Sequence, residues 1–306
     1  MSSIVSSHSP DAVLRAVSVL NAGGLVGLPT ETVYGLAARA DNDDAVAKIF
    51  QAKGRPTGHP LILHISDTSE LDRYAVNVPV AALTLAEQCW PGPLTLLLAK
   101  SSEVSHLVTG GRETVAIRVP ANTCARAIIE RCGQGLAAPS ANIFGHVSPS
   151  TAQHVLDDLG DKVDLIVDDG DCSIGVESTI VDFTAREPQL LRPGGFPVED
   201  LESIMGAKLS MPSGESRASG MLASHYAPQC KVILVNNFAE ALTVREANPQ
   251  SRILEYADNF PLYAASLYTQ MRQADNDGLA MIIAILPIKT GLGTAIHDRL
   301  CKASFL

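Results

Sequence analysis

Hydroxyl groups, cations and tight turns recur at the ends of apolar runs in this sequence. Residues 29–36 read PTETVYGL, residues 53–56 read KGRP, and residues 139–142 read PSAN. An α/β protein presents polar groups in this way to a small bound ligand. The pattern therefore indicates a site for a small phosphorylated ligand.

The two cations of the second block are one residue apart. Lys53 and Arg55 flank Gly54, and Pro56 follows. On a helix or a strand these side chains would diverge, but in a turn both can approach one anion, the lysine as a point charge and the arginine as a planar fork. Such a turn is usually solvated surface. Its position between a hydroxyl-rich segment and a buried-looking strand is what favours an anion site.

The first block and a later arginine allow two interpretations each. Thr30 and Thr32 can donate and accept hydrogen bonds, and Glu31 can receive an ammonium group, but the same run would also make a capping turn before a helix. Arg118 interrupts the apolar strand predicted over 115–119, where a buried charge must reach solvent or meet an anion. A structural salt bridge and ligand binding are therefore both open for Arg118.

Several common nucleotide and metal motifs are absent from the sequence. There is no Gly-x-x-x-x-Gly-Lys-Ser/Thr phosphate loop, and the glycine pair at 291–293 lacks the third glycine of a dinucleotide fingerprint. The His-Glu-x-x-His pattern, the cysteine zinc patterns and the Gly-x-Ser-x-Gly nucleophile elbow are missing too. A nucleotide bound by this chain must be held by a less common cradle.

The composition describes an acidic chain that is long enough for two cores. It has 306 residues, 46% of them hydrophobic, and a formal net charge of -10. No global basic field attracts nucleic acid or an anionic membrane, so an anionic ligand must be held by local cations. The six cysteines are scattered and no secretory signal is found, which favours reduced thiols and a cytoplasmic location. The longest uncharged apolar run, 279–288, is too short to span a bilayer and is expected to be a buried strand.

Strand and helix patterns follow one another through the first two thirds of the chain. Ser9 is a possible N-cap for a helix over 9–24, and Asn42 or Asp43 can cap a second helix that ends at residue 50. Further helices are predicted over 80–89, 122–132 and 150–159. Strands are predicted over 25–28, 61–65, 94–99, 115–119, 136–138, 165–167 and 179–183. This mixture predicts an α/β layer architecture and leaves the strand order open.

A change of composition marks the expected domain boundary. Residues 207–228 are rich in Ser, Gly, Ala and Pro. Beyond them the pattern predicts strands over 231–235 and 279–286, and helices over 238–246, 262–273 and 294–302. These elements suit a small three-layer α/β domain. The predicted division is therefore a domain over 1–206, a linker over 207–229 and a second domain over 230–306.

The blocks described above occur together and in order in one known family. With GVESTI at 175–180, LLRPGG at 190–195 and SGMLASHYAP at 219–228, they resemble the YrdC-like family, in the long two-domain form of the threonylcarbamoyl-AMP synthases. The resemblance implies a twisted open sheet with flanking helices and a smaller Rossmann-like α/β domain at the C-terminus. One departure is Ala37, where the family commonly has a glycine.

The resemblance also implies an activity. Enzymes of this kind join L-threonine, bicarbonate or carbon dioxide, and ATP with Mg²⁺ to give threonylcarbamoyl-adenylate and pyrophosphate. A separate transferase complex then uses the product to modify the adenosine next to the tRNA anticodon. The implied partners are these substrates and that complex, with no membrane and with weak or absent direct binding of tRNA.

Site residues are implied wherever this sequence matches the motifs of the family. Catalytic roles are implied for Lys53, Arg55, Ser140 and Asn142. ATP contacts are implied for Arg55, His59, Thr114, Ser140, Ser148, Arg192 and Tyr226, the tyrosine closing over the nucleotide from the linker. Threonine contacts are implied for Thr32, His64, Arg118, Ala138 and Ser178, and no residue is implied as a metal ligand.

Two functions from other classes stay open. One is a double-stranded RNA-binding module, because YrdC-like folds have been linked to such RNA, although the acidic balance argues against it. The other is a sensor in which the C-terminal domain reports bound ATP or threonine to a partner. Release of pyrophosphate from ATP separates a synthase from both.

Overall fold

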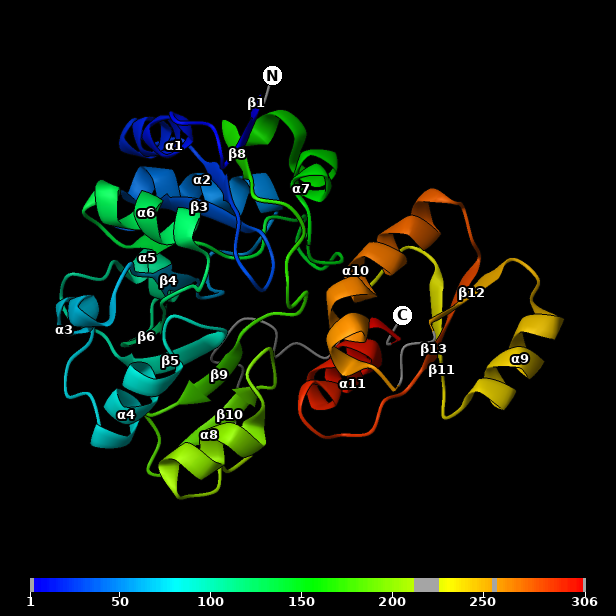
Figure 1. Ribbon diagram of the computed structural model, residues 1–306. Coiled ribbons are helices and arrows are strands. Elements are labelled where there is room, and N and C mark those ends of the chain that lie inside the picture. Colours follow the sequence, from blue (N-terminus) through cyan, green and yellow to red (C-terminus); the bar gives the residue numbers. More distant parts are fainter. Residues whose placement is uncertain (1–2, 212–225, 255–257, 305–306) are drawn as a thin grey trace.

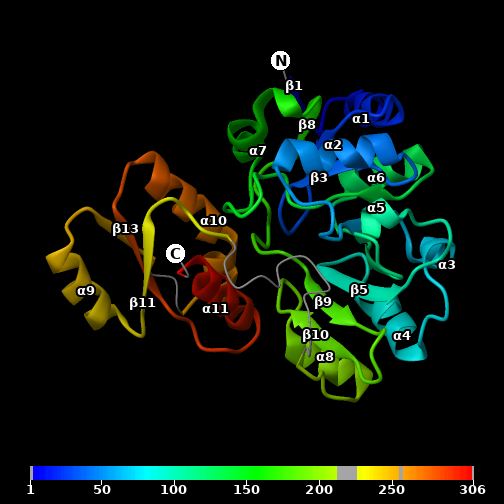
Figure 2. The same cartoon turned by 180° about the vertical axis from the view of Figure 1, so that it is seen from behind.

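The protein folds into a large mixed sheet with helices on both faces and a small parallel sheet with helices of its own (Figure 1). The structure is a computed structural model, and it describes residues 3–211, 226–254 and 258–304. Figure 2 shows the same two sheets from behind, well separated from each other. The predicted α/β class is confirmed.

The large sheet has ten strands in the order β1-β8-β2-β3-β7-β4-β6-β5-β9-β10. Parallel pairs such as β4 with β6 and β5 with β9 are mixed with antiparallel pairs such as β2 with β3 and β5 with β6. Neighbouring strands are often distant in the sequence, so this order brings remote strand ends together. The strands are β1 Ser3–Ser6, β2 Val26–Leu28, β3 Gly35–Arg39, β4 Ile62–His64, β5 Leu94–Ala99, β6 Thr114–Arg118, β7 Leu136–Ala137, β8 Leu165–Asp168, β9 Thr179–Asp182 and β10 Gln189–Arg192.

Helices cover both faces of this sheet and bury two separate apolar clusters. Ala16 and Leu20 of α1 pack with Ile128 of α6 on one face, whereas Ile49 of α2 and Leu85 of α4 belong to the larger cluster on the other. Asn42 caps α2 by accepting a hydrogen bond from the amide of residue 45 at 3.1 Å. The helices are α1 Ala12–Asn21, α2 Asp43–Lys53, α3 Leu71–Tyr74, α4 Val80–Cys89, α5 His106–Thr109, α6 Thr123–Cys132, α7 Ala152–Leu159 and α8 Val198–Met205.

The small sheet forms a three-layer unit with its helices, which we call the C-terminal domain. Its strands are parallel in the order β11-β13-β12. Figure 1 shows α10 and α11 between this sheet and the N-terminal domain, with α9 on the outer face. The elements are β11 Lys231–Val235, α9 Phe238–Ala247, β12 Ser251–Leu254, α10 Phe260–Asn276, β13 Met281–Ile285 and α11 Leu292–Ala303.

The two domains share one apolar cluster. Val33, Val147 and Val176 of the N-terminal domain are buried in it together with Tyr268 of α10 and Ile296 of α11. An interface of this kind holds the two domains in one arrangement. The C-terminal domain is therefore packed directly against the loops of the large sheet.

Most predicted elements are confirmed to within a few residues, but one cap is wrong, and four strands and the helices α3, α5 and α8 were missed. Helix α1 begins at Ala12 after Asp11, and Ser9 lies instead in a turn in which its carbonyl accepts from the amide of Ala12. The missed strands β1, β3, β10 and β12 are short, with four or five residues each, and they depend on tertiary pairing with neighbouring strands. The predicted domain boundaries stay predictions, and residues 212–225 of the linker lie outside the described residues.

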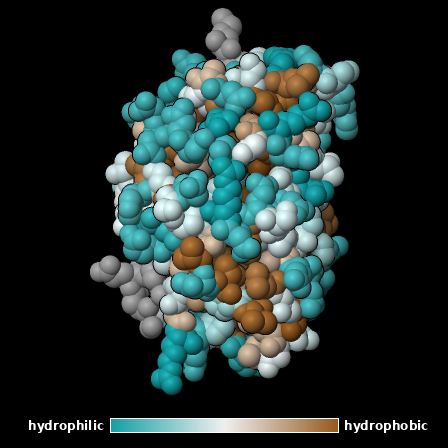
Figure 3. All heavy atoms as spheres, turned by 90° about the vertical axis from the view of Figure 1, so that its left-hand side faces the viewer, coloured by the Kyte–Doolittle hydropathy of each residue, from teal (hydrophilic) through white to brown (hydrophobic). Residues whose placement is uncertain are grey.

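The face of the N-terminal domain turned away from the small sheet is mainly hydrophilic, with hydrophobic residues gathered in its lower half (Figure 3). Exposed large hydrophobic residues of this domain include Val76, Val80 and Leu83, in and just before α4.

No helix in the described ranges is long and apolar enough to cross a membrane.

Candidate active site

A cavity lies where loops and strand ends of the large sheet meet the C-terminal domain. Its walls come from the loop between β2 and β3, from β4, from the ends of β6, β7 and β10, and from the segment before β9. The predicted site residues on its lining are Thr32, Arg55, His64, Arg118, Ala138, Ser140, Ser178, Arg192 and Tyr226. Residues predicted from separate motifs thus meet in one place, as expected for a ligand site at strand ends.

The lining carries more positive than negative charge. Arg55, Arg118 and Arg192 contribute guanidinium groups, and Glu177 is the carboxylate among the described lining residues. The whole chain has a net charge of -10, so these cations are concentrated locally. The cavity therefore suits an anionic ligand, as the composition required.

The hydroxyl-rich block forms the loop that joins β2 to β3, so the interpretation as a capping turn before a helix is wrong. Thr30 fixes the loop, because its Oγ1 donates to the carbonyl of Val33 at 2.6 Å and accepts from the amides of Thr32 and Val33 at 3.2 Å. Thr32 lies on the cavity lining with its Oγ1 2.9 Å from that of Thr30. The first threonine shapes the loop and the second presents a hydroxyl.

Arg118 forms a structural salt bridge and also lies on the cavity lining, so ligand binding by this residue stays a prediction. Its Nη2 forms a salt bridge with Oε1 of Glu31 at 2.6 Å, and its Nη1 donates to Oγ1 of Thr32 at 2.7 Å. Its Nε donates to the carbonyl of Gly92 at 3.2 Å. The side chain is 3% exposed yet lies on the cavity lining. A planar fork is thus held rigidly at the wall, where it can meet a carboxylate.

His64 presents an uncharged imidazole to the cavity. Burial, together with the nearby Arg118 cation, lowers its pKa to about 3. Its Nδ1 lies 3.2 Å from the carbonyl oxygen of Ile62, which can only accept. Nδ1 therefore carries the proton, and Nε2 is left as an acceptor.

Lys53 and Arg55 diverge, so the prediction that both approach one anion is wrong for the lysine. Helix α2 continues through Lys53, and Gly54 then adopts a left-handed conformation with φ of 62° that turns the chain away before Arg55. Arg55 reaches the cavity, whereas Lys53 is not among its lining residues. The Arg55 guanidinium donates to the carbonyl of Pro60 at 2.9 Å and lies 5.4 Å from the Phe144 ring.

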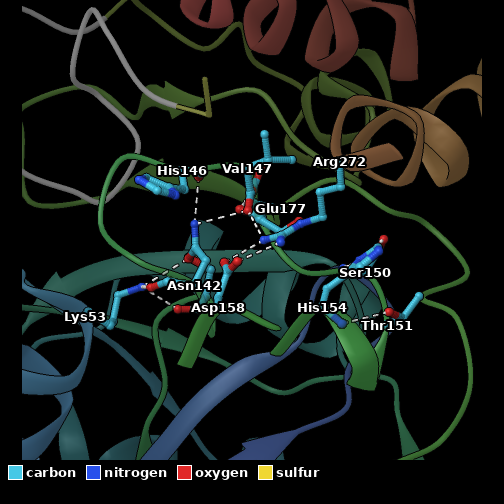
Figure 4. A network of polar contacts seen from close by, with 12 residues as sticks. Lys53, Asn142, His146, Val147, Ser150, Thr151, His154, Asp158, Glu177 and Arg272 are labelled. Carbon is cyan, nitrogen blue, oxygen red and sulfur yellow. Dashed lines mark hydrogen bonds and ion pairs between the residues drawn. The ribbon is translucent and has the colours of Figure 1, made fainter. Parts of the chain in front are cut away.

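Lys53 instead holds the turn that contains Ser140 and Asn142 (Figure 4). Its Nζ donates to the carbonyls of both residues at 2.6 Å and to Oδ1 of Asn142 at 3.1 Å. The Asn142 side chain also accepts from Oγ of Ser140 at 2.6 Å and donates to the carbonyl of His146 at 2.7 Å. Burial and the nearby Arg55 keep the pKa of Lys53 well below its usual value. Lys53 and Asn142 thus fix the turn of Ser140, which of these three residues is the one on the cavity lining, and their catalytic roles stay predictions.

Arg192 and Ser178 form the opposite wall. Arg192 donates from Nε to the carbonyl of Ser178 at 3.0 Å and from Nη2 to its hydroxyl at 3.1 Å. The Ser178 hydroxyl also lies 2.7 Å from that of Thr95 in β5. These contacts fix the third guanidinium at the end of β10, on the lining of the cavity.

Three residues assigned to ATP by resemblance do not line this cavity. His59 packs against Phe144, with ring centroids 5.3 Å apart, and so lies one side chain away from Arg55. Thr114 is the first residue of β6 and pairs with Ala99. Ser148 donates to Oε1 of Glu177 at 2.6 Å and supports the wall from behind.

Glu177 is a lining residue that sequence reasoning missed. It was singled out only as part of the block before Ser178, and its signal is a charge in an otherwise small and apolar run. Its carboxylate accepts from Ser148, from the Tyr268 hydroxyl at 2.9 and 3.1 Å, and from Nε of Arg299 at 2.7 Å. The last two partners belong to the C-terminal domain, so this domain supports a lining residue from behind.

Tyr226, at the end of the predicted linker, also lines the cavity. Its side chain is 1% exposed, and the ring packs 6.0 Å from that of Tyr268 and 4.8 Å from the Arg299 guanidinium. The neighbouring Ala227 forms a β-bridge with His146, close to the Asn142 turn. The rest of the predicted closing segment, 212–225, lies outside the described residues.

Comparison with known proteins agrees with this architecture. The Sua5/YciO/YrdC family profile, described as "Telomere recombination", matches residues 18–194, and the profile of the "Threonylcarbamoyl-AMP synthase, C-terminal domain" matches residues 196–304. The threonylcarbamoyl-AMP synthase of Pyrococcus abyssi is 40% identical over 94% of this chain and 93% of its own length. That of Bacillus subtilis is 38% identical over 98% of this chain and 94% of its own length.

Solved structures give the same result. The crystal structure of P. abyssi Sua5 complexed with L-threonine has a TM-score of 0.93 to this chain at 37% identity, and the match covers 99% of this chain and 97% of that one. Both domains, and not only the large sheet, are therefore shared. The chain belongs to the threonylcarbamoyl-AMP synthase family.

Proposed function

We propose that this protein is an L-threonylcarbamoyladenylate synthase, which forms threonylcarbamoyl-AMP and pyrophosphate from L-threonine, bicarbonate or carbon dioxide, and ATP. The observation that carries the proposal is the cavity in which Arg55, Arg118 and Arg192 lie on one lining in an acidic chain. The family membership and the similarity to a threonine-bound relative support it.

The reaction needs two bond-forming steps. The neutral amine of threonine first adds to carbon dioxide with loss of a proton, or to bicarbonate with loss of water, and either route gives a carbamate. An oxygen of the carbamate then attacks the α-phosphorus of ATP, while the bond to the departing pyrophosphate breaks. Both steps depend on holding anions close together and in line, so positioning and charge neutralisation are the expected sources of rate enhancement.

Arg118 is the proposed partner of the threonine carboxylate. Its guanidinium is held by Thr32 and Glu31. His64 adds a neutral acceptor for the threonine hydroxyl or amine. Ser178 and the backbone near Ala138 complete this side of the cavity.

Arg55 and Arg192 are the proposed partners of the phosphates, with the Ser140 hydroxyl as a further donor. Burial lowers the pKa of Arg55 only to about 10, so this group stays cationic at neutral pH. Tyr226 covers the same cavity. ATP contacts at His59, Thr114 and Ser148 stay predictions, which require the nucleotide to extend beyond the lining residues.

Mg²⁺ is proposed to enter as part of the MgATP substrate. Among the described residues no group of three or more His, Cys, Asp or Glu side chains is placed to hold a metal ion. In this proposal the phosphate oxygens supply the main ligands, and the ion adds positive charge at the reacting phosphates. The transferase complex that consumes the product, a cytoplasmic location and weak tRNA binding are proposals of the same kind, supported by the family membership and the net charge.

Pyrophosphate release by the purified chain tests the proposal, with each of threonine, bicarbonate and MgATP omitted in turn. Release that needs all three supports the synthase. Binding of ATP and threonine without release would replace it by the sensor, and salt-dependent binding of double-stranded RNA without release would replace it by the RNA module.

A further inference from the structure

The C-terminal domain reaches the cavity through one fully buried arginine. Arg299 of α11 is 0% exposed, and its Nε donates to Oε2 of Glu177 at 2.7 Å, across the domain interface. The same guanidinium lies 4.8 Å from the Tyr226 ring. Glu177 and Tyr226 both line the cavity, whereas Arg299 does not.

Stability alone does not explain this buried ion pair. Removing two charges from water costs about as much as their mutual attraction returns, so apolar residues of similar size would dock the domains equally well. The Arg299 guanidinium also has a nitrogen, Nη2, without a hydrogen-bond partner among the described residues. The placement of the pair at the cavity wall points to a function.

The consequence of the contact is electrostatic. Glu177 is the carboxylate on a lining that also carries Arg192, and the two charges are close enough to interact. Arg299, Tyr268 and Ser148 together occupy both carboxylate oxygens. Without Arg299, the negative charge of Glu177 would act on Arg192 and oppose an incoming phosphate.

We propose that Arg299 is a positioning residue for the adenylate-forming reaction: it compensates the Glu177 carboxylate and supports the Tyr226 ring, so that docking of the C-terminal domain completes the anion-binding cavity. The proposal rests on the proposed function for its substrate, ATP. It assigns to the C-terminal domain a direct part in nucleotide binding, through a side chain that does not touch the nucleotide.

The proposal has a pH signature. The groups that face Glu177 are Arg299 of α11, Tyr268 of α10, Tyr226, Ser148 and Arg192, and Arg299 is itself also paired with Asp298 of α11. Burial alone would raise the pKa of Glu177. Arg299, Arg192 and the hydrogen bonds outweigh this effect and lower the pKa to about 2. In Arg299→Met the largest lowering cause is lost, so the pKa rises. Glu177 then becomes neutral as the pH falls, and its repulsion of phosphate is relieved.

The test compares Arg299→Met, Arg299→Lys, Glu177→Gln and the double variant Arg299→Met/Glu177→Gln. Arg252→Met is the matched control, because Arg252 forms a partly exposed ion pair with Asp277 in the same domain. We expect kcat/KM for ATP to fall by about tenfold or more in Arg299→Met at pH 8, in the range of coupled buried pairs. The loss should shrink as the pH is lowered, and the double variant and Arg299→Lys should each recover part of it.

Equilibrium binding of MgATP, measured by calorimetry, gives a readout that is independent of the reaction. If the wild-type chain forms no threonylcarbamoyl-AMP, the proposed function fails, but the same order of ATP dissociation constants would still support the role of Arg299. The role is overturned if Arg299→Met behaves like Arg252→Met, or if its defect is independent of pH and the double variant is no better. Should Arg299→Met not fold, Tyr268→Phe removes one hydrogen bond from Glu177 and should weaken ATP binding severalfold, and an unchanged constant would overturn the role.

Discussion

The salt bridge between Arg118 and Glu31 offers a way to separate folding from ligand binding at the proposed threonine site. Their side chains are 4% and 8% exposed, and Nη2 lies 2.6 Å from Oε1. Arg118→Met would leave the Glu31 carboxylate buried without its partner, which costs about 3–5 kcal/mol of unfolding free energy. Arg118→Met/Glu31→Gln removes the uncompensated charge, so most of this stability should return.

Threonine binding should not return with the stability. A charged donor to a carboxylate contributes about 1.5–3 kcal/mol, so both variants should lose roughly 10- to 150-fold in kcat/KM for threonine. Urea unfolding measures the first effect, and pyrophosphate release at varied threonine concentration measures the second. If the double variant recovers threonine dependence together with stability, Arg118 is a structural residue and the assignment is wrong.

Three further predictions concern His64, Lys53 and the metal ion. The pKa of His64 is about 3 in the folded chain, against an ordinary value of 6.5, so the unfolded chain takes up the proton first as the pH falls. His64 should therefore lower the unfolding free energy below pH 6.5, by up to about 1.4 kcal/mol per pH unit. His64→Gln should remove that slope in urea unfolding between pH 4 and 6, and an unchanged slope contradicts a buried neutral imidazole. Lys53→Met removes three hydrogen bonds to the turn of Ser140. It should lower the unfolding free energy by about 2–4 kcal/mol and should also lower kcat. Loss of ATP binding at full stability would instead show that Lys53 contacts the phosphates directly. EDTA should abolish pyrophosphate release without lowering the Tm of the chain in the absence of ATP, and a lower Tm would reveal a resident metal.

The fold was predictable where elements are long or clearly amphipathic. Strand β5 and helix α6 lie where the pattern predicted them, because Leu94–Ala99 is apolar apart from one threonine and Thr123–Cys132 buries one apolar face. Strand β3 was missed because three of the five residues of Gly35–Arg39 are glycine or alanine, and its strand conformation comes from pairing with β2 and β7.

Site residues could be predicted from the sequence where the signal lies in the residue's own local motif. Arg118 is a charge in a predicted apolar strand, and such a charge needs a partner or a ligand. Arg192 was implied by the family resemblance alone. The divergence of Lys53 from Arg55 was missed, because it depends on where α2 ends. The contact between Glu177 and Arg299 joins residues 122 positions apart, and no local pattern contains it.

The central claim is tested most directly by the mass of the product made from ¹³C-bicarbonate, ¹⁵N-threonine and MgATP. The account predicts one adenylate that carries both labels, together with pyrophosphate, because the carbamate carbon and the threonine nitrogen enter the same molecule. An adenylate that carries ¹⁵N without ¹³C would mean that the carboxylate of threonine itself is activated, and it would contradict the account.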